Sequence, residues 1–388
     1  MRLNNSQKEK IKKDYGVDRI WSFSQLSTFE NCPWEYKMKY VDKKRVDNSN
    51  VYTDFGTFCH DTVQDFYEQK VSKQDLPKLW ANHVEKWENN PFAHQFTTAK
   101  VRAGYLENLK HYFSYTDDLV GNHKIANEKP VLVNLERNGK KYIFVGYIDT
   151  IFKDENGLNL LDYKTSSKSS FSGAKLAEKS MQLQLYAIGE HQRTNMPYEE
   201  ISCKFDMMKY CTVHFKQENG KWNTSNQERS KWVLKMEKKL KTKLKKAGFT
   251  EGQQDALFDK AVELNSLDFE GMPKDIAEQF YITNYLIDLD ISEEACEKLS
   301  EKVLDLCDKI LEFEALDEID MENYLELNHP YNPNDYYEKN LCAYHTSQEF
   351  KDQEIDMDNS VLGGDNEVDS ELSEFFSSQD DDLENIFV

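Results

Sequence analysis

Three charged side chains in the middle of the chain have the types and spacing of a metal-dependent hydrolytic site. They are Asp149 and the acid and base of Asp162-Tyr163-Lys164, in a segment from Lys141 to Ser166 that reads KYIFVGYIDTIFKDENGLNLLDYKTS. Carboxylate oxygens are ligands that Mg²⁺ and Mn²⁺ prefer. An ammonium beside them can orient water and offset negative charge. The three side chains therefore predict a divalent-metal site with an adjacent lysine, provided that they share one face.

Two apolar strands must position these side chains. We expect them over Tyr142–Phe152 and Leu158–Thr165, on either side of Asn156-Gly157, which is a strong hairpin signal. If these two residues form the loop, Asp149 lies directly opposite Lys164 and one diagonal step from Asp162, so all three project from one face. A four-residue loop would keep this parity, and a three-residue loop would break it.

A solvated ladder of ion pairs is the plain alternative, because isolated surface pairs are common and contribute little. The flanking segments Ile143-Phe144-Val145 and Leu158-Asn159-Leu160-Leu161 are too apolar for an open surface. Carboxylates beside buried strands need a partner, and a metal ion would supply one.

At these residues the chain resembles the RecB-type branch of the PD-(D/E)xK nucleases, which includes AddB-like nuclease domains and CRISPR-associated relatives. A lone D-x-K is common, but five motifs in the family's order across roughly 165 residues are specific. The resemblance implies an α+β (α/β) restriction-endonuclease-like core, in which helices flank a mixed sheet with an antiparallel meander. The five motifs are S-x-S-x-L-x-x-F-x-x-C-P from Ser22 to Pro33, G-x-x-x-H from Gly56 to His60, G-x-x-D from Gly146 to Asp149, D-x-K from Asp162 to Lys164, and Q-x-x-x-Y from Gln182 to Tyr186.

The resemblance implies a role for each residue near the metal. Asp149 and Asp162 would bind Mg²⁺ or Mn²⁺, and Lys164 would orient or activate the attacking water. His60 and the backbone carbonyl of Tyr163 would assist the two acids. Without the family resemblance, His60 would be read as a boundary residue, because a histidine beside an apolar helix stripe is more often that than a metal ligand. The stripe consists of Phe55, Phe58, Cys59, Thr62, Val63 and Phe66.

Two further residues belong to the implied site, and one is an additional candidate. Gln182 and Tyr186 share one face of a helix expected over Ala174–Gln192. The resemblance places them at the active-site edge, where they steady the lysine region and Tyr186 touches nucleic acid. Packing of this helix against the sheet is the alternative. Glu128 precedes the first strand of the meander, although most such glutamates are simply solvated.

The cysteines indicate the compartment and argue against a common cofactor of the family. Seven cysteines without a C-x-x-C pair predict a reducing cytoplasm, either bacterial or that of a host cell if a virus encodes the chain. Many RecB-type nucleases hold an iron–sulfur cluster through the cysteine of the C-P motif and a C-terminal triad. Cys32 is present, but Cys342 is the last cysteine of the chain, so a four-cysteine cluster is not predicted. A residual site of Cys32, Cys342 and His345 is left open.

The formal charge of −21 is unevenly distributed. Residues 351–388 contain thirteen acids and one lysine, whereas Lys231–Lys246 contains eight lysines and one acid. Apolar residues recur within the lysine segment, which predicts a helix with a basic face. This face is either simply solvated or a phosphate-contacting rim for the substrate strand. The lysines of that rim would be Lys235, Lys238, Lys239, Lys241 and Lys243.

Composition divides the chain into a polar lead-in over residues 1–20, a nuclease domain over 21–350 and an acidic tail over 351–388, which is expected to be disordered. Helical insertions are expected at about 50–125 and 225–320. The tail holds two L-x-x-(F/I)-F islands that resemble peptides docking on sliding clamps, and the end of the chain also resembles the tip of single-stranded-DNA-binding proteins. A solubilising or DNA-mimicking arm is the alternative. The island residues are Leu372, Phe375, Phe376, Leu383, Ile386 and Phe387.

These features predict a metal-dependent deoxyribonuclease acting in DNA replication, recombination or repair, with an exonuclease on DNA ends as the first choice. The alternatives are an endonuclease that cuts branched or flapped DNA and a catalytically inert nuclease fold that serves as a scaffold. No G-x-x-x-x-G-K-[ST] motif is present, so unwinding would require a helicase partner. No signal peptide or membrane-spanning segment is expected.

Overall fold

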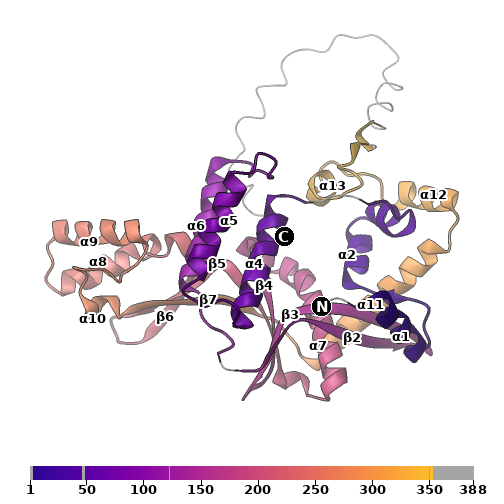
Figure 1. Ribbon diagram of the computed structural model, residues 1–388, viewed down its shortest axis with the longest axis horizontal. Helices are drawn as coiled ribbons and strands as arrows, with labels where there is room; N and C mark the ends of the chain where they lie inside the picture. The colour runs from indigo at the N-terminus through magenta and orange to yellow at the C-terminus, as the bar shows by residue number, and fades with distance from the viewer. Residues whose placement is uncertain (1–2, 46–48, 122, 349, 353–388) are drawn as a thin grey trace, which may run out of the picture.

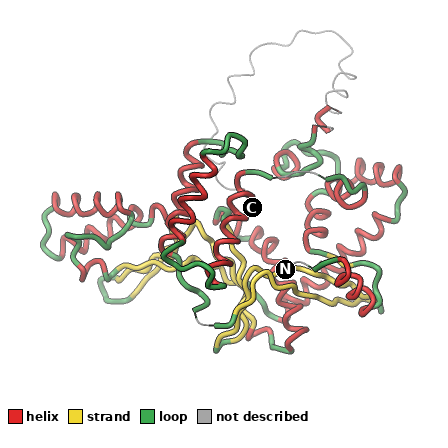
Figure 2. The backbone as a smooth tube through the Cα atoms, viewed as in Figure 1, coloured by secondary structure: helices red, strands yellow, loops and turns green. Residues whose placement is uncertain are grey.

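The structure, a computed structural model, describes residues 3–45, 49–121, 123–348 and 350–352 of the 388-residue chain. A mixed sheet runs through the centre of the molecule, with helices on both sides (Figure 2). Its strands are β1 (Ile20–Trp21), β2 (Ile125–Arg137), β3 (Lys140–Asp154), β4 (Gly157–Lys164), β5 (Ile201–Lys216), β6 (Trp222–Glu228) and β7 (Phe280–Asp288).

Two long strands organise this sheet. Strand β3 pairs with antiparallel β2 along one edge, and on its other edge with parallel β1 in one half and antiparallel β4 in the other. Strand β5 pairs with parallel β4 and then with antiparallel β6, and β7 lies antiparallel along its other edge. The crossover from β4 to β5 contains α7 (Ala174–Thr194), as a parallel pair requires.

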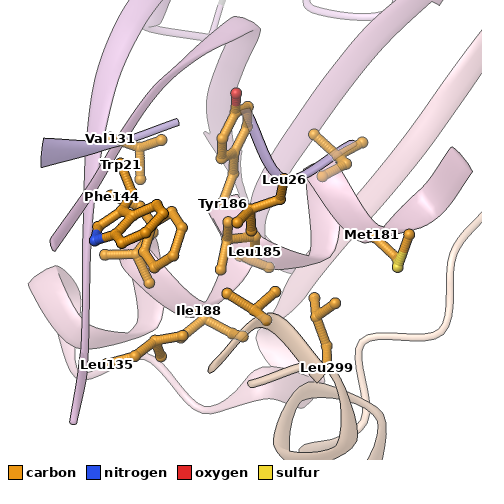
Figure 3. Close-up of a cluster of buried hydrophobic side chains, with 14 of the residues drawn as sticks. Trp21, Leu26, Val131, Leu135, Phe144, Met181, Leu185, Tyr186, Ile188 and Leu299 are labelled. Atoms are coloured by element: carbon orange, nitrogen blue, oxygen red, sulfur yellow. The ribbon is translucent and has the colours of Figure 1, made fainter. Parts of the chain in front are cut away.

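Successive residues of β4 direct their side chains to opposite faces of the sheet. Leu160 packs in a hydrophobic cluster with α7, α2 and α11, whereas Leu161 packs in a second cluster with α4, α5 and α6. Figure 1 shows the two groups of helices, and Figure 3 shows part of the first cluster. The bounds are α2 (Phe23–Asn31), α4 (Val51–Tyr67), α5 (Leu76–Glu88), α6 (Ala99–Tyr115) and α11 (Glu293–Glu314).

A third cluster covers the distal half of β5, around Val213 and Phe215. Its helices form the arm at the left of Figure 1. They are α8 (Glu237–Lys246), α9 (Glu251–Leu264) and α10 (Lys274–Ala277). The remaining helices are α1 (Asn5–Tyr15), α3 (Pro33–Tyr36), α12 (Glu318–Asn328) and α13 (Tyr336–Asn340). No helix of the described residues is long and apolar enough to cross a membrane.

The expected fold class is confirmed, with differences in several elements. Residues 1–20 were expected to be a polar lead-in, but α1 forms there, begins with a capping box at Asn4 and buries none of its residues. The expectation of helices alone over residues 225–320 is wrong at β7. Phe280–Asp288 reads FYITNYLID, which is rich in β-branched and aromatic residues, and it pairs with the outer edge of β5.

The basic segment Lys231–Lys246 is helical over only part of the predicted length. Two short 3₁₀ turns, Arg229–Lys231 and Leu234–Met236, precede α8, which begins at Glu237. Trp232, Val233 and Met236 are all buried in the third cluster. The chain turns these three side chains inward before the regular helix begins.

The register of the β3–β4 hairpin also differs from the expectation. Asp154 pairs with Gly157, so the two-residue loop is Glu155-Asn156 and not Asn156-Gly157. The Asp154 carboxylate accepts hydrogen bonds from the backbone N–H groups of Asn156 and Gly157, at 2.8 and 3.1 Å. Gly157 has φ +133°, and a Cβ there would lie 2.0 Å from the Glu200 carbonyl oxygen, so the glycine is required within the strand. The shift of two positions preserves the parity of the faces.

Candidate active site

The candidate site lies where β3 separates from β4. The ladder of the two strands ends at the pair Thr150–Leu161, and one further step would place Asp149 opposite Asp162, not opposite Lys164 as expected. Asp149 Oδ2 accepts a hydrogen bond of 3.2 Å from the backbone N–H of Tyr163. Through this hydrogen bond Asp149 links β3 to β4 just beyond their last paired residues.

His60 reaches this position from α4. Its Nδ1 lies 3.1 Å from Asp149 Oδ2, and its side chain is 36 % exposed. Phe55, Cys59 and Val63 are buried on the helix face beneath it, and Phe58 is only partly buried. The stripe seen in the sequence therefore fixes the rotation of α4, and this rotation directs His60 toward the end of β3.

Lys164 and Asp162 form a second charged pair. Lys164 Nζ lies 2.6 Å from Asp162 Oδ2, and the two side chains are 23 % and 16 % exposed. The contact is an ion pair that lacks hydrogen-bond alignment: among the described residues, Asp162 Oδ2 has no hydrogen-bond partner although it is buried. This oxygen retains lone pairs that a cation could use.

The two carboxylates differ in their electrostatics. Burial would raise the pKa of Asp149, but the hydrogen bond and charge of His60 outweigh it and hold that pKa below its ordinary value. Burial raises the pKa of Asp162, against the lowering effect of Lys164, and the charge of Asp149 adds to the rise. Burial would lower the pKa of Lys164, but Asp162 and Asp149 raise it, so the ammonium keeps its proton at neutral pH.

Gln182 and Tyr186 of α7 complete one side of the site. Gln182 Nε2 donates a 2.8 Å hydrogen bond to the Tyr186 hydroxyl, and Asp162 and Asp149 help to raise the pKa of this largely buried phenol, after burial itself. In Figure 3 the hydroxyl points away from Leu185 and Ile188. A Cβ at position 146 would lie 2.1 Å from the Tyr186 ring. The glycine of G-x-x-D therefore makes room for the tyrosine of Q-x-x-x-Y, a relation that neither motif reveals alone.

The donor set fits a hard divalent cation. The two carboxylates are close enough for the charge of Asp149 to raise the pKa of Asp162, and an imidazole lies beside Asp149. Like charges at opposed positions of a sheet destabilise it unless a cation intervenes. Glu128 occupies an irregular position of β2 with φ +46°, between the pairs that flank Asp149 on β3. It stays a candidate for the same cation.

A cleft of about 780 Å³ begins directly after Lys164 and contains a feature that the sequence did not indicate. Its lining includes Thr165, Ser167, Lys100, Lys209 and Lys231, together with tyrosines and three glutamates. Lys209 lies on β5 without any neighbouring motif, so only the tertiary structure brings it here.

The expected phosphate-contacting rim does not line this cleft, and its role stays a prediction. Lys241 pairs with Glu237 and Asp255 at 2.7 and 2.8 Å, and Lys243 donates to the Lys216 carbonyl. Lys239 lies over the ring of Phe215, and Lys235 and Lys238 lie on the same arm, in the 3₁₀ turn before α8 and in α8 itself.

The remaining candidates fall into two groups. Cys32 meets Cys342 and His345, two residues near the end of the described chain, in a buried cluster. Two thiols and an imidazole do not make the four-thiolate set that an iron–sulfur cluster takes. The six apolar residues of the tail islands lie outside the described residues, so their docking role stays a prediction. They are Leu372, Phe375, Phe376, Leu383, Ile386 and Phe387.

Comparisons with known proteins support the fold class described above. A family model described as the PD-(D/E)XK nuclease superfamily matches residues 20–318. A protein of Clostridium novyi (strain NT), named as a subunit of an ATP-dependent helicase/deoxyribonuclease, is 24 % identical over 305 residues, which are 68 % of this chain and 26 % of that protein. Its namesake in Carboxydothermus hydrogenoformans is 25 % identical over 207 residues, covering 45 % and 19 %. The chain thus spans about a quarter or less of these relatives.

Proposed function

Because this chain belongs to the PD-(D/E)XK nuclease superfamily, we propose that it is a metal-dependent deoxyribonuclease with its active site at His60, Asp149, Asp162 and Lys164. The observation that carries the proposal is the convergence of two half-buried ion pairs, His60–Asp149 and Lys164–Asp162, at the end of one hairpin. A solvated surface ladder of ion pairs would leave its side chains exposed, whereas Lys164 and Asp162 are only 23 % and 16 % exposed.

Each residue has a distinct role in this proposal. Asp149 and Asp162 hold Mg²⁺ or Mn²⁺ with help from His60 and the Tyr163 carbonyl, and the bound ion supplies Lewis-acid activation of water and of the phosphate. Asp162 and Asp149 raise the pKa of Lys164. In this proposal Lys164 orients or activates the attacking water and offsets the negative charge of the phosphate.

Gln182 and Tyr186 act at the edge of the same pocket. The hydrogen bond from Gln182 fixes the Tyr186 hydroxyl, whose ring packs against Gly146 on the strand that carries Asp149. This packing fixes Tyr186 beside Lys164, at a place where it can contact the DNA strand. Both residues are positioning residues in this proposal, and only Tyr186 touches the substrate.

DNA ends are the proposed substrate, processed in replication, recombination or repair. The cleft that begins at Thr165 gives a nucleic-acid strand a path away from Lys164, past Lys100 and Lys209. The relatives' name, which combines helicase and deoxyribonuclease, supports a helicase partner for this chain as well. We also propose that the chain acts in the cytoplasm, since its seven cysteines without a C-x-x-C pair favour a reducing compartment. A structure-specific endonuclease is the second candidate, because the fold does not determine whether a DNA end is required.

The proposal is tested by incubating the full chain with end-labelled and circular DNA in Mg²⁺ or Mn²⁺. We expect linear DNA to be degraded and the covalently closed circle to survive. Asp162→Ala and Lys164→Ala should each lower the rate at least about 100-fold, because each removes charge stabilisation that water cannot replace. Lys153→Ala is the matched control, since Lys153 is an exposed lysine on the same hairpin.

The outcomes separate the candidate functions. Cleavage of circular, flapped or branched DNA at the same rate as linear DNA would select the endonuclease. If the wild type and both variants are equally inert on every substrate in both metals, the chain is a scaffold and the proposed activity is wrong.

A further inference from the structure

The cluster of Cys32, Cys342 and His345 lies apart from the active-site residues and joins two segments that are far apart in the sequence. The two Sγ atoms are 3.0 Å apart, and His345 Nδ1 lies 3.8 Å from Cys32 Sγ. All three residues are buried, with 2 %, 0 % and 4 % of their surfaces exposed. Their ligand atoms all lie within 4.8 Å of one another.

The surrounding structure holds these side chains in place. Cys32 ends α2 and caps α3, where its Sγ accepts the backbone N–H of Glu35 at 3.4 Å. Cys342 follows α13, and its backbone N–H donates to the Tyr337 carbonyl at 2.7 Å. Trp34 stacks on Tyr344 with ring centroids 5.0 Å apart. The three donors are therefore presented by an ordered contact between α2–α3 and the segment after α13.

Two other arrangements of the cysteines can be compared with this structure. The two thiols are free here and are not joined in a disulfide. A four-thiolate cluster needs two more cysteines nearby, but the other five lie buried in α4, β5 and α11. They are Cys59, Cys203, Cys211, Cys296 and Cys307.

We propose that Cys32, Cys342 and His345 bind one Zn²⁺ ion. Two thiolates and an imidazole are the soft and borderline ligands that zinc takes in proteins. Tetrahedral Zn–S bonds of about 2.3 Å place two sulfurs about 3.8 Å apart. The observed pair reaches that spacing by opening less than about 1 Å, and water fills the fourth position.

The zinc ion cross-links the two ends of the nuclease domain. The ligands Cys32 and Cys342 are 310 positions apart, so the ion closes a loop that contains nearly all of the sheet. Closing so long a loop removes much conformational freedom from the unfolded chain, and metal binding of this kind contributes directly to folding. The ion therefore stabilises the fold without taking part in catalysis.

The test measures metal in the full chain, purified without chelators from zinc-supplied cells. We expect about one zinc per chain, and less than about one fifth of that in Cys342→Ser and in His345→Ala, because a structural site needs all its ligands. Cobalt exchanged into the wild type should produce a thiolate-to-cobalt charge-transfer band that Cys342→Ser lacks. Cys307→Ala, which removes a buried thiol outside the cluster, should keep both zinc and band.

Two further variants make the result independent of folding and of nuclease activity. His345→Cys preserves the ligand number, so it should fold, keep zinc and strengthen the charge-transfer band. Asp162→Ala should keep its zinc whether or not the chain cleaves DNA. Less than about 0.1 zinc per chain in the wild type, iron with acid-labile sulfide, or five titratable thiols in denaturant where the sequence has seven would each overturn the proposal.

Discussion

The Asp162 carboxylate is buried in an environment that opposes its charge. Burial raises its pKa and the charge of Asp149 adds to the rise, whereas the Lys164 ammonium, 2.6 Å from Oδ2, opposes it. Buried like charges cost stability unless cations neutralise them. This unfavourable electrostatic environment is consistent with a pocket shaped for a metal ion that the proposed reaction needs.

His60 should control how tightly that ion is held. His60→Ala removes the imidazole that lies 3.1 Å from Asp149 Oδ2. We expect the Mg²⁺ concentration for half-maximal nuclease activity to rise about 10- to 100-fold, as when the partners of metal ligands are removed. A metal titration of the initial rate measures this change.

The control is His94→Ala, which breaks a similar pair, 2.9 Å from His94 Nδ1 to Asp54 Oδ2, at an exposed position. An unchanged metal requirement in His60→Ala would show that His60 only packs beside the site.

Gly146 should be intolerant of any side chain because of Tyr186. Gly146→Ala places a Cβ 2.1 Å from the Tyr186 ring, and we expect it to lower the free energy of unfolding by about 1–3 kcal/mol through overpacking. Urea denaturation measures this loss. Adding Tyr186→Ala removes the clash, so the double variant should be less destabilised than the sum of the single variants.

Gly104→Ala is the matched control, because nothing lies within 4 Å of the added carbon in α6. It should be neutral or stabilising by about 0.5–1 kcal/mol. Simple additivity of Gly146→Ala and Tyr186→Ala would contradict the predicted contact.

At the scale of elements, β5 connects the catalytic half of the sheet to the arm of α8, α9 and α10. It pairs with β4 in its first half and with β6 in its second, and a bulge between Asp206 and Cys211 interrupts its ladder with β7. Asp206 is fully buried at this bulge. Its Oδ2 accepts hydrogen bonds from the Tyr112 hydroxyl at 2.7 Å and the Asn284 side-chain amide at 2.9 Å.

This acid should make stability depend on pH. Burial raises the pKa of Asp206 to about 6, although Tyr112, Arg229 and Asn284 lower it and Asp117 adds to the rise. The folded state then binds more protons than the unfolded state between about pH 4 and pH 6. The free energy of unfolding should therefore fall by roughly 2 kcal/mol across that interval as the pH rises.

Asp206→Asn isolates this contribution, because the amide oxygen can still accept both hydrogen bonds. Urea denaturation from pH 4 to pH 7 measures the free energy of unfolding of both proteins. As the pH rises, the wild type should lose stability relative to the variant. A difference that stays constant would show that Asp206 remains ionised throughout.

At the scale of the whole molecule, the net charge is distributed unequally between the nuclease domain and the tail. Residues 353–388 contain twelve acids and no base, so they carry more than half of the net charge of −21. Removing them should tighten non-specific DNA binding at about 50 mM salt, because long-range repulsion is lost, and the gain should vanish near 500 mM. Equilibrium binding to labelled duplex DNA at both salt concentrations measures this.

The comparison with a charge-preserving variant separates repulsion from docking. Replacing Leu372, Phe375 and Phe376 by alanine keeps the charge and should leave DNA binding unchanged. Equal affinities of the full and shortened chains at low salt would mean that the acidic residues do not repel DNA.

Several parts of this structure were determined by the sequence alone. The alternation of apolar and charged residues in β3 and β4 sets the parity of Asp149, Asp162 and Lys164, because side chains in a strand alternate with period two. A local pattern likewise predicted α7 from Ala174. Asn138-Gly139, a pair typical of two-residue hairpin loops, forms the turn between β2 and β3 with positive φ at both residues. Neither of these features requires contacts with distant segments.

The tertiary structure alone decided which charges meet. The Glu200 carbonyl packs against Gly157 and places this glycine in the strand and not in the loop, so Asp162, not Lys164, follows opposite Asp149. The packing of α4 brings His60 to Asp149, and the fold brings Cys342 to Cys32 across 310 positions. Local propensity cannot determine such contacts, because they form only when segments far apart in the chain pack together.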